Sequence, residues 1–364
     1  MNRITVQYNN KHGYDIYLDN SFDALGSELI KLGTKDRKIC IVSETNVAPL
    51  YMKQVKDIVS TVCSKTVSYV FEAGEKNKNL NTVRELYSVL IEEHFDRNDF
   101  LIALGGGVTG DLTGFAAATY LRGISFVQVP TTLLSQVDSS IGGKTGVDFD
   151  AYKNMVGAFH QPSLVFINYS TLKSLPEREF LSGMGEVIKH GLIKNKEEFY
   201  WLTENCNGIK AIEDNIIEHL LAESIKVKQK VVESDPMEKG ERALLNFGHT
   251  IGHAIEKRMN FTLFHGECVS IGAVLAAKIS LIKGLISEAD YNDIVECFRM
   301  FELPVDTKEY RLNNEDLENI VNDTKNDKKM DGDKVKFILL NSIGDAVINK
   351  EITTDIMLDV LKNQ

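Results

Sequence analysis

Two histidines four residues apart, His249 and His253, lie in the segment ALLNFGHTIGHAIE. In a helix this spacing puts both imidazoles on one face. Arg242 and Asn246 precede them at helical intervals, so the pattern predicts one helix whose polar face carries all four side chains. The alternative is an ordinary solvated face, which lysines and glutamates would favour more than this set does. By analogy with zinc-binding helices, the spacing alone favours a metal site in which both histidines bind one ion.

Two further segments offer metal ligands. GMGEVIKHG contains Glu186 and His190 four residues apart, and LFHGECVS places His265 just before an apolar helix. A catalytic zinc ion takes three protein ligands, often two histidines and a carboxylate, and keeps one position open. Spacing does not choose among His190, His253 and His265 as the remaining ligand.

A glycine-rich turn, GGGVTG at residues 105–110, follows an apolar run and precedes a predicted helix. Such a turn lets backbone amides approach a pyrophosphate at the helix N-terminus. The acidic residue expected about twenty positions later to hold a ribose is missing. Glu44 in SETN is an alternative ribose acceptor, and AGEKNK adds Glu75 and Lys78 at a second turn. A tight turn without a ligand is the competing interpretation.

The loop between PTT and HQP carries Asp138, Lys144, Lys153 and Asn154 among glycines and small polar residues, without strong periodicity. Lysines near glycine turns suit a phosphate or carboxylate ligand, but an ordinary surface loop has a similar composition.

Lys228 lies on the apolar stripe of a long predicted helix, together with Leu221, Ile225 and Val232. A lysine at this place either extends its ammonium group to the surface or is buried and directed into a cleft.

The elements that must position these residues change character near Pro176. Before it, short apolar β-rich runs alternate with helical ones, which predicts an α/β Rossmann-like domain at residues 1–175 with a parallel sheet covered on both faces. Residues 176–364 read as a mostly α-helical domain, and strand character returns only near KVKFILL. A cleft between the domains is where a site is expected.

Composition narrows the class of protein. The chain has 364 residues, a formal net charge of −11 and an isoelectric point of about 5.3, which argues against nucleic acid or an anionic membrane as partner. The N-terminus lacks a signal-type apolar core, and SIGAVLAAKISLI is interrupted by Lys278, so no membrane span is expected. Five scattered cysteines predict reduced thiols and a cytoplasmic protein.

Across nearly its whole length the chain resembles the 3-dehydroquinate synthase family of the sugar phosphate cyclase superfamily. The similar segments are GGGVTGDLTGFAAATYLRG, VPTTLLSQVDSSIGGKTGVD, KNMVGAFHQP, TLKSLPEREFLSGMGEVIKHG, ERALLNFGHTIGHAIE and HGECVSIGA. The resemblance implies a dehydroquinate synthase-like fold, a homodimer, and a sugar phosphate substrate, 3-deoxy-D-arabino-heptulosonate 7-phosphate. It also implies NAD as a catalyst that is regenerated in each turnover, and Zn2+, with Co2+ able to occupy the same ligands.

The family's residues carry over position by position. The metal ligands fall on Glu186, His249 and His265, against the spacing argument, and His253 falls on a substrate contact. The resemblance assigns catalytic roles to Asp138, Lys144, Lys189, Lys228, Arg242, Asn246 and His253. It assigns further substrate contacts to Arg122, Lys153, Asn154, Glu238 and one lysine of DKK, taken as Lys328 with Lys329 as the alternative. It assigns the NAD site to Glu44, Asn46, Glu75, Lys78, Gly107, Val108, Thr109, Gly110, Asp111, Thr131, Thr132, Lys144, Lys153, Thr171, Leu172, Lys173 and Ser174. Two positions depart from the common pattern, because the family usually has aspartate at Glu44 and an aliphatic residue at Thr109.

Three other functions compete with this interpretation. Related cyclases that make inososes or valiolones share the NAD turn and the metal set, but the many lysines here suit a substrate with both phosphate and carboxylate. A metal-dependent polyol dehydrogenase of the glycerol dehydrogenase type would release NADH and would need fewer anion-binding groups. A non-catalytic NAD sensor would not need the metal ligands.

Overall fold

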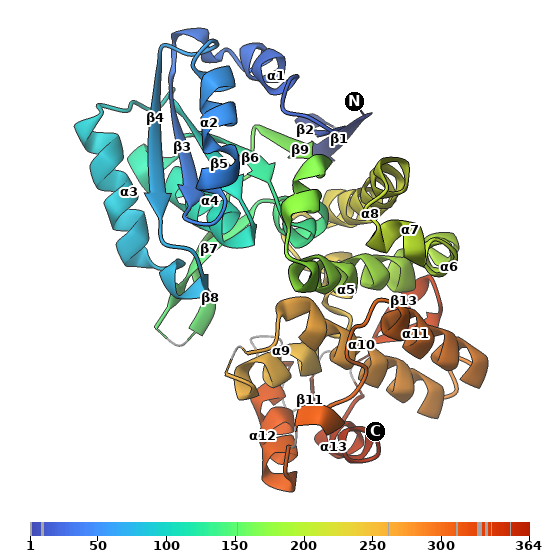
Figure 1. The fold of residues 1–364 in the computed structure, drawn as a ribbon. Helices are drawn as coiled ribbons and strands as arrows, with labels where there is room; N and C mark the ends of the chain where they lie inside the picture. The colour runs from blue at the N-terminus through green and yellow to red at the C-terminus, as the bar shows by residue number, and fades with distance from the viewer. Residues whose placement is uncertain are drawn as a thin grey trace. The chain divides into compact units, whose positions relative to one another are not determined.

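The computed structural model describes residues 2–8, 11–150, 152–260, 262–310, 312–325, 330–331, 334–335, 337–349 and 351–364. The chain divides into two compact units, residues 1–175 and 176–364, each with its own core. Figure 1 labels most of the elements of both units.

Unit 1 is built on a seven-stranded sheet with the strand order β1-β2-β9-β6-β5-β3-β4. The first two strands pair antiparallel and every other pair is parallel, so the predicted parallel sheet is confirmed with one antiparallel edge strand. The strands are β1 (Asn2–Tyr8), β2 (Lys11–Asp19), β3 (Lys38–Glu44), β4 (Lys65–Phe71), β5 (Phe100–Gly105), β6 (Ser125–Pro130) and β9 (Leu164–Asn168).

Helices cover both faces of this sheet (Figure 1). They are α1 (Leu25–Lys31) and α2 (Ala48–Val59) on one face, and α3 (Leu80–Glu92) and α4 (Gly107–Thr119) on the other. Along β3, Ile39 and Ile41 join the first core, whereas Cys40 and Val42 join the second. Because alternate side chains of a strand point to opposite faces, a strand buried on both sides must be apolar throughout, as these runs are.

The loop between PTT and HQP is more regular than its sequence indicates. It contains a π-helical turn at Ser135–Ser139 and an antiparallel hairpin of β7 (Lys144–Phe149) and β8 (Tyr152–Phe159). Val147 joins the core beneath α3 and α4, which anchors the hairpin. Alternation is hard to see in the sequence because glycines interrupt both strands and β8 is largely exposed.

Unit 2 is mostly helical, as predicted. Its helices are α5 (Glu177–Lys194), α6 (Lys196–Glu204), α7 (Cys206–Lys210), α8 (Asp214–Ser234), α9 (His249–Arg258), α10 (His265–Ile282), α11 (Glu288–Met300), α12 (Asn314–Lys325) and α13 (Thr354–Lys362). Two small antiparallel pairs complete it, β10 (Met330–Asp331) with β11 (Lys334–Val335), and β12 (Phe337–Ser342) with β13 (Asp345–Asn349). The KVKFILL strand signal therefore corresponds to β11 and β12.

Helix α10 is the central helix of unit 2 and packs against α5, α9, α11 and α13. Contrary to the sequence argument, it is long and apolar enough to cross a membrane, with a mean hydropathy of 1.4 over 18 residues. However, 78% of that stretch is buried inside the protein, so the hydropathy is that of a core helix. All five cysteines lie in the described part of the chain and are free thiols, as predicted.

Candidate active site

Three histidines and one glutamate converge in unit 2 from three helices. Glu186 lies in the middle of α5, His249 is the first residue of α9, and His265 is the first residue of α10. The Nε2 atoms of His249 and His265 each lie 3.3 Å from Oε1 of Glu186. The imidazole nitrogens of His249, His253 and His265 approach within 4.8 Å of one another. The four side chains thus surround one point, with ligand types that suit a divalent transition metal.

Glu186 is fully buried, and its two carboxylate oxygens have different surroundings. Oε2 accepts a hydrogen bond from the ammonium group of Lys189, which is also buried. Oε1 is buried without a well-formed hydrogen bond, although two imidazole nitrogens face it. An unsatisfied buried oxygen normally needs an explanation, and a role as metal ligand is one. The set of donors therefore fits a metal ion.

The electrostatics of the cluster support the same conclusion. Burial by itself would raise the pKa of Glu186, but Lys189 and His249 outweigh it, so the pKa lies well below its ordinary value. Burial lowers the pKa of His249 and favours the neutral ring. Burial also acts to lower the pKa of His265, but the carboxylates of Glu186 and Glu256 raise it to about 9. An ionised carboxylate and neutral imidazole are the forms that bind metal, and a bound cation would displace the proton of His265.

Two glycines let these helices approach closely enough for the ligands to meet. A Cβ atom on Gly266 would lie 1.7 Å from the carbonyl oxygen of Ser182 in α5, which no side chain could tolerate. Gly248 has a φ of +77°, and a Cβ there would lie 2.8 Å from the amide nitrogen of Ala273 in α10. The first contact places the N-terminal end of α10 next to α5, and the second places the N-terminal end of α9 against α10. Gly252 also packs closely against Cys268 of α10.

The prediction of one helix through Arg242, Asn246, His249 and His253 is wrong. Arg242 and Asn246 belong to a 3-10 helix, Glu241–Asn246, and α9 begins only at His249. Gly248 is in the left-handed conformation between them, which ends helical continuity. Of these four residues, only His249 and His253 therefore lie on one face of a single helix, as their spacing of four residues predicts.

The basic residues predicted in unit 2 are buried. Lys189 and Arg242 are about 1% exposed, and Lys228 is 5% exposed. Lys228 therefore does not extend to the surface, so the surface alternative for this lysine is wrong. Arg242 donates from Nη1 to the carbonyl of Pro236 at 2.8 Å, and Asn246 donates from Nδ2 to Oε1 of Glu238 at 3.0 Å.

In unit 1 the glycine-rich turn has the predicted place between β5 and α4. Gly106 precedes the first residue of α4, so the amides of residues 107–109 form the open N-terminal end of that helix, and the amide of Gly110 donates to the carbonyl of Gly106 at 3.0 Å. Thr131 follows β6 beside this turn, because its amide donates to the carbonyl of Gly105 at 3.0 Å. The hydroxyl of Thr131 is buried without a hydrogen bond. A buried donor without a partner next to a helix N-terminus fits a site for a polar ligand such as a dinucleotide.

The remaining predicted nucleotide residues lie in turns of unit 1. Glu44 ends β3, and its carboxylate accepts from the amides of Asn46 at 2.7 Å and Val47 at 3.0 Å, so it caps the turn before α2. Thr132 shares hydrogen bonds with Ser135 at the turn after β6. The TLKS residues Thr171, Leu172, Lys173 and Ser174 form the end of a 3-10 helix, Tyr169–Ser174.

Lys78 is the centre of a polar cluster in unit 1. It is 4% exposed, and its Nζ atom lies 2.7 Å from Oδ2 of Asp111 and 2.7 Å from Oδ1 of Asn154. Glu75 lies 3.8 Å from both Lys78 and Lys153. Burial acts to lower the pKa of Lys78, but Asp111 and Glu75 outweigh it and raise the pKa above its ordinary value, so the ammonium stays charged. Residues predicted separately for NAD and for substrate therefore form one cluster.

Other predicted residues of unit 1 occupy turns and edges. Asp138 lies in the π-helical turn, Lys144 is exposed at the first position of β7, and Arg122 is exposed with a φ of 68°. Lys328 and its alternative Lys329 lie outside the described residues.

Two relevant residues are missing from the sequence predictions. Asp148 accepts from the amide of Asn154 at 2.8 Å, and burial raises its pKa. Glu256 lies 3.8 Å from Nδ1 of His265. Its spacing of seven residues from His249 puts both on one face of α9, which was a usable signal.

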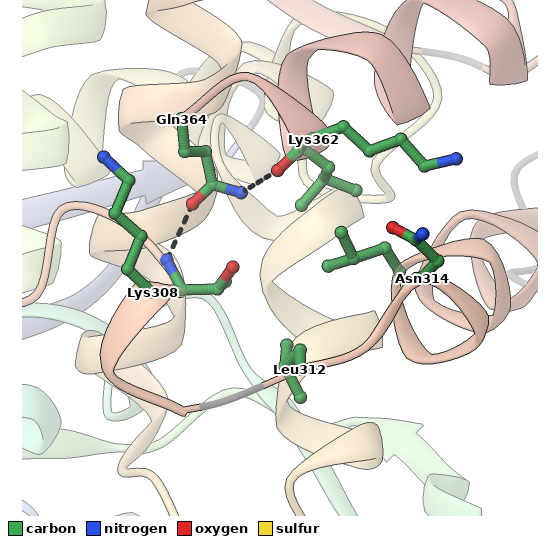
Figure 2. Close-up of a pocket in the computed structure, with 8 residues that line it drawn as sticks. Lys308, Leu312, Asn314, Lys362 and Gln364 are labelled. Carbon is green, nitrogen blue, oxygen red and sulfur yellow. Dashed lines mark hydrogen bonds between the residues drawn. The ribbon is translucent and has the colours of Figure 1, made fainter.

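A hollow of about 320 Å3 near the end of unit 2 is a different feature (Figure 2). Gln364 closes one side of it, because its side chain accepts from the amide of Thr307 at 2.6 Å and donates to the carbonyl of Leu361 at 2.8 Å. Lys308 and Lys362 line it, but it shares no residue with the histidine cluster. The chemistry of the donors, and not the size of this hollow, identifies the candidate site.

The fold is shared with solved structures of 2-deoxy-scyllo-inosose synthase and 2-epi-5-epi-valiolone synthase. A crystal structure of 2-deoxy-scyllo-inosose synthase complexed with carbaglucose-6-phosphate, NAD+ and Co2+ superposes with a TM-score of 0.89 over 100% of both chains, at 24% identity. A 2-epi-5-epi-valiolone synthase from Streptomyces hygroscopicus subsp. jinggangensis 5008, with NAD+ and Zn2+ bound, has a TM-score of 0.87 over 98% of both chains, at 26% identity. The resemblance to the first shows the fold alone.

Sequence comparison defines the family within this class. The model of the 3-dehydroquinate synthase N-terminal domain matches residues 68–182, and that of the C-terminal domain matches residues 183–330. A 3-dehydroquinate synthase from Acetivibrio thermocellus is 44% identical over 326 residues, 90% of this chain and 89% of that protein. One from Ruminiclostridium cellulolyticum is 42% identical over 354 residues, 96% of this chain and 97% of that protein. The chain belongs to the 3-dehydroquinate synthase family, and it is an enzyme of the carbon–oxygen lyase class.

Proposed function

We propose that this chain performs the dehydroquinate synthase reaction with a divalent metal held by Glu186, His249 and His265. The observation that carries the proposal is the buried Oε1 of Glu186, which faces two imidazole Nε2 atoms at 3.3 Å and has no well-formed hydrogen bond. Zn2+ suits one carboxylate and two imidazoles, and Co2+ suits the same ligands. When bound, the metal acts as a Lewis acid that lowers the pKa of a substrate hydroxyl and favours its oxidation.

We propose that unit 1 binds NAD at the N-terminal end of α4. The amides at residues 107–109 and the unpaired hydroxyl of Thr131 support this placement. Glu44 ends β3, the strand that pairs with β5, and the hydroxyl of Thr171 in the 3-10 helix donates to the carbonyl of Thr131 at 3.3 Å. When bound, NAD supplies a reversible oxidation of one substrate hydroxyl, so it is regenerated within each turnover. The cluster around Lys78 orders Asp111 and Asn154 on one side of this region.

The buried basic residues of unit 2 are proposed to bind the substrate's charged groups. Lys189, Lys228 and Arg242 are each at most 5% exposed, so their charge acts in a poorly solvated environment where charge-assisted hydrogen bonds to phosphate and carboxylate are strong. Lys189 also keeps Glu186 ionised, which keeps a metal ligand ready. Asn246, oriented by Glu238, and the exposed His253 are proposed to contact the reacting hydroxyl groups.

Further residues are assigned on the family resemblance. In unit 1 these are the proposed substrate contacts Arg122, Asp138, Lys144, Lys153 and Asn154. With the substrate held through several groups at once, positioning supplies much of the rate for a reaction with several steps.

A homodimer in the cytoplasm is the proposed cellular form. Support for the compartment comes from five free cysteines, four of them buried, and from the burial of the strongly apolar helix α10. The dimer rests on the family resemblance, and light scattering during size-exclusion chromatography tests it.

One experiment tests the reaction. The purified protein is mixed with Zn2+, a trace of NAD and the heptulosonate phosphate, and phosphate release and NADH absorbance are followed together. We expect many phosphates per NAD and no net NADH. NADH that accumulates in step with substrate loss would contradict the internal redox cycle, and a chelator-treated sample without added metal serves as the control.

A further inference from the structure

The outer nitrogen of each candidate ligand histidine has its own partner. Histidines that bind metal through one ring nitrogen usually donate the other N–H to a carbonyl or carboxylate, which fixes the plane of the ring. His249 follows this rule, because its Nδ1 atom lies 3.1 Å from the carbonyl oxygen of Phe247 while Nε2 faces Glu186. The partner is a backbone atom held by the turn at Gly248, so this ring is oriented by the fold itself.

The second ligand histidine is oriented by a side chain. Nε2 of His265 faces Glu186 at 3.3 Å, and Nδ1 faces Oε2 of Glu256 at 3.8 Å. Glu256 lies on α9 seven residues after His249, so the same helix face presents one ligand and the carboxylate beside another ligand. At 3.8 Å the contact is an ion pair and is longer than a hydrogen bond. Hydrogen bonds of catalytic groups are often long in unliganded sites and shorten on binding.

Burial makes this carboxylate unusual. Glu256 is 6% exposed, and a carboxylate rarely stays so deeply buried unless it is paired, because desolvation costs several kcal/mol. Its neighbours on α9 follow the ordinary pattern, since Lys257 and Arg258 reach the partly exposed acids Asp323 and Asp316 of α12. A buried carboxylate next to a metal-ligand histidine therefore has a role other than that of an ordinary surface charge.

We propose that Glu256 is a positioning residue for the metal site, which accepts a hydrogen bond from Nδ1–H of His265 and holds Nε2 toward the ion. This inference rests on the proposed metal ligands Glu186, His249 and His265. It gives the two histidines different supports, a backbone carbonyl for one and a carboxylate for the other. Loss of the carboxylate leaves all three ligands in place but lets the ring of His265 rotate.

The test measures Zn2+ affinity of the full-length protein by chelator competition, together with the visible spectrum of the Co2+-loaded form. Glu256→Met keeps the approximate size but removes the acceptor, and we expect affinity to fall about 10- to 100-fold, the usual effect of losing such a partner. Glu256→Gln keeps an acceptor and should retain most of the affinity. Asp323→Asn is the matched control, because it removes one carboxylate from the contacts of the same helix without touching a ligand.

The outcomes separate three explanations. A weaker affinity and a changed Co2+ spectrum in the methionine variant, with recovery in the glutamine variant, support the positioning role. Wild-type affinity in the methionine variant, or an equal loss in Asp323→Asn, overturns it. If Glu256→Met does not fold, Glu256→Ala is measured with the same expectation and the same criterion. Failure of the wild-type protein itself to bind metal would instead refute the proposed ligand set.

Discussion

The two histidines of α9 provide the sharpest test of the site, because they are four residues apart but have different surroundings. His249 is 9% exposed, its Nδ1 is oriented by Phe247, and its Nε2 lies 3.3 Å from Glu186. His253 is exposed, although its ring lies 5.1 Å from that of His249 between centroids. We therefore expect His249→Ala to remove a metal ligand and His253→Ala to remove a catalytic group.

The size of the difference follows from the number of ligands. A structural zinc site with four ligands binds with roughly 10–16 kcal/mol, so one ligand contributes about 3 kcal/mol. His249→Ala should therefore weaken Zn2+ binding by about 100-fold. His253→Ala should leave Zn2+ binding within a few-fold of wild type. Loss of a general acid or base lowers kcat by roughly 10²–10⁴-fold, and we expect an effect of this size for His253→Ala at saturating metal.

Chelator competition gives the metal affinities, and phosphate release at saturating Zn2+ gives kcat. The thermal transition of each metal-free variant is measured first, so that a folding defect is not mistaken for a lost ligand. Equal loss of metal affinity in the two variants would refute the reasoning and return both histidines to the metal, as their spacing alone suggested.

Three further predictions concern other parts of the molecule. Lys78→Met should destabilise unit 1 by about 3 kcal/mol, because it leaves the carboxylate of Asp111 without its buried cation. The midpoint of urea unfolding should recover in the double variant with Asp111→Asn, and a wild-type midpoint in the single variant would contradict this prediction. Burial raises the pKa of Glu198 to about 7 from an ordinary value of 4.5. The protonated carboxyl group therefore makes its full contribution to the free energy of unfolding below pH 4.5, and this contribution is lost as the pH rises through 7. Glu198→Gln should therefore gain stability relative to wild type between pH 5 and pH 8 by roughly 1–2 kcal/mol in urea unfolding, and a difference that does not change with pH refutes it. The Lys228→Ala variant should fold and bind Zn2+, but its KM for the phosphate substrate should rise at least about tenfold, as expected for a lost charged hydrogen bond. Unchanged kinetics would exclude Lys228 from the substrate site.

Local patterns in the sequence predicted the elements well. The apolar runs became β3, β5 and β6, buried on both faces, and the segments after Pro176 became helices. Period and composition carry this information because a strand covered on both sides has no polar face, and because helix and turn signals depend on neighbouring residues. The break at Gly248 was missed, because helical spacing continues through it and the reason for the break is the backbone of α10.

Only the tertiary structure decided which polar residues meet. Glu186, His249 and His265 come from three helices, and Lys78, Asp111 and Asn154 come from three segments of unit 1. The resemblance to a family identifies these residues one by one, but no rule of sequence spacing predicts a contact between positions that are tens of residues apart. Their meeting depends on packing, such as the contact of Gly266 with Ser182, which brings the first residue of α10 next to α5. By itself the sequence determined the strands, helices and charged residues, whereas long-range packing decided which of those charges are buried together, and hence which can do chemistry.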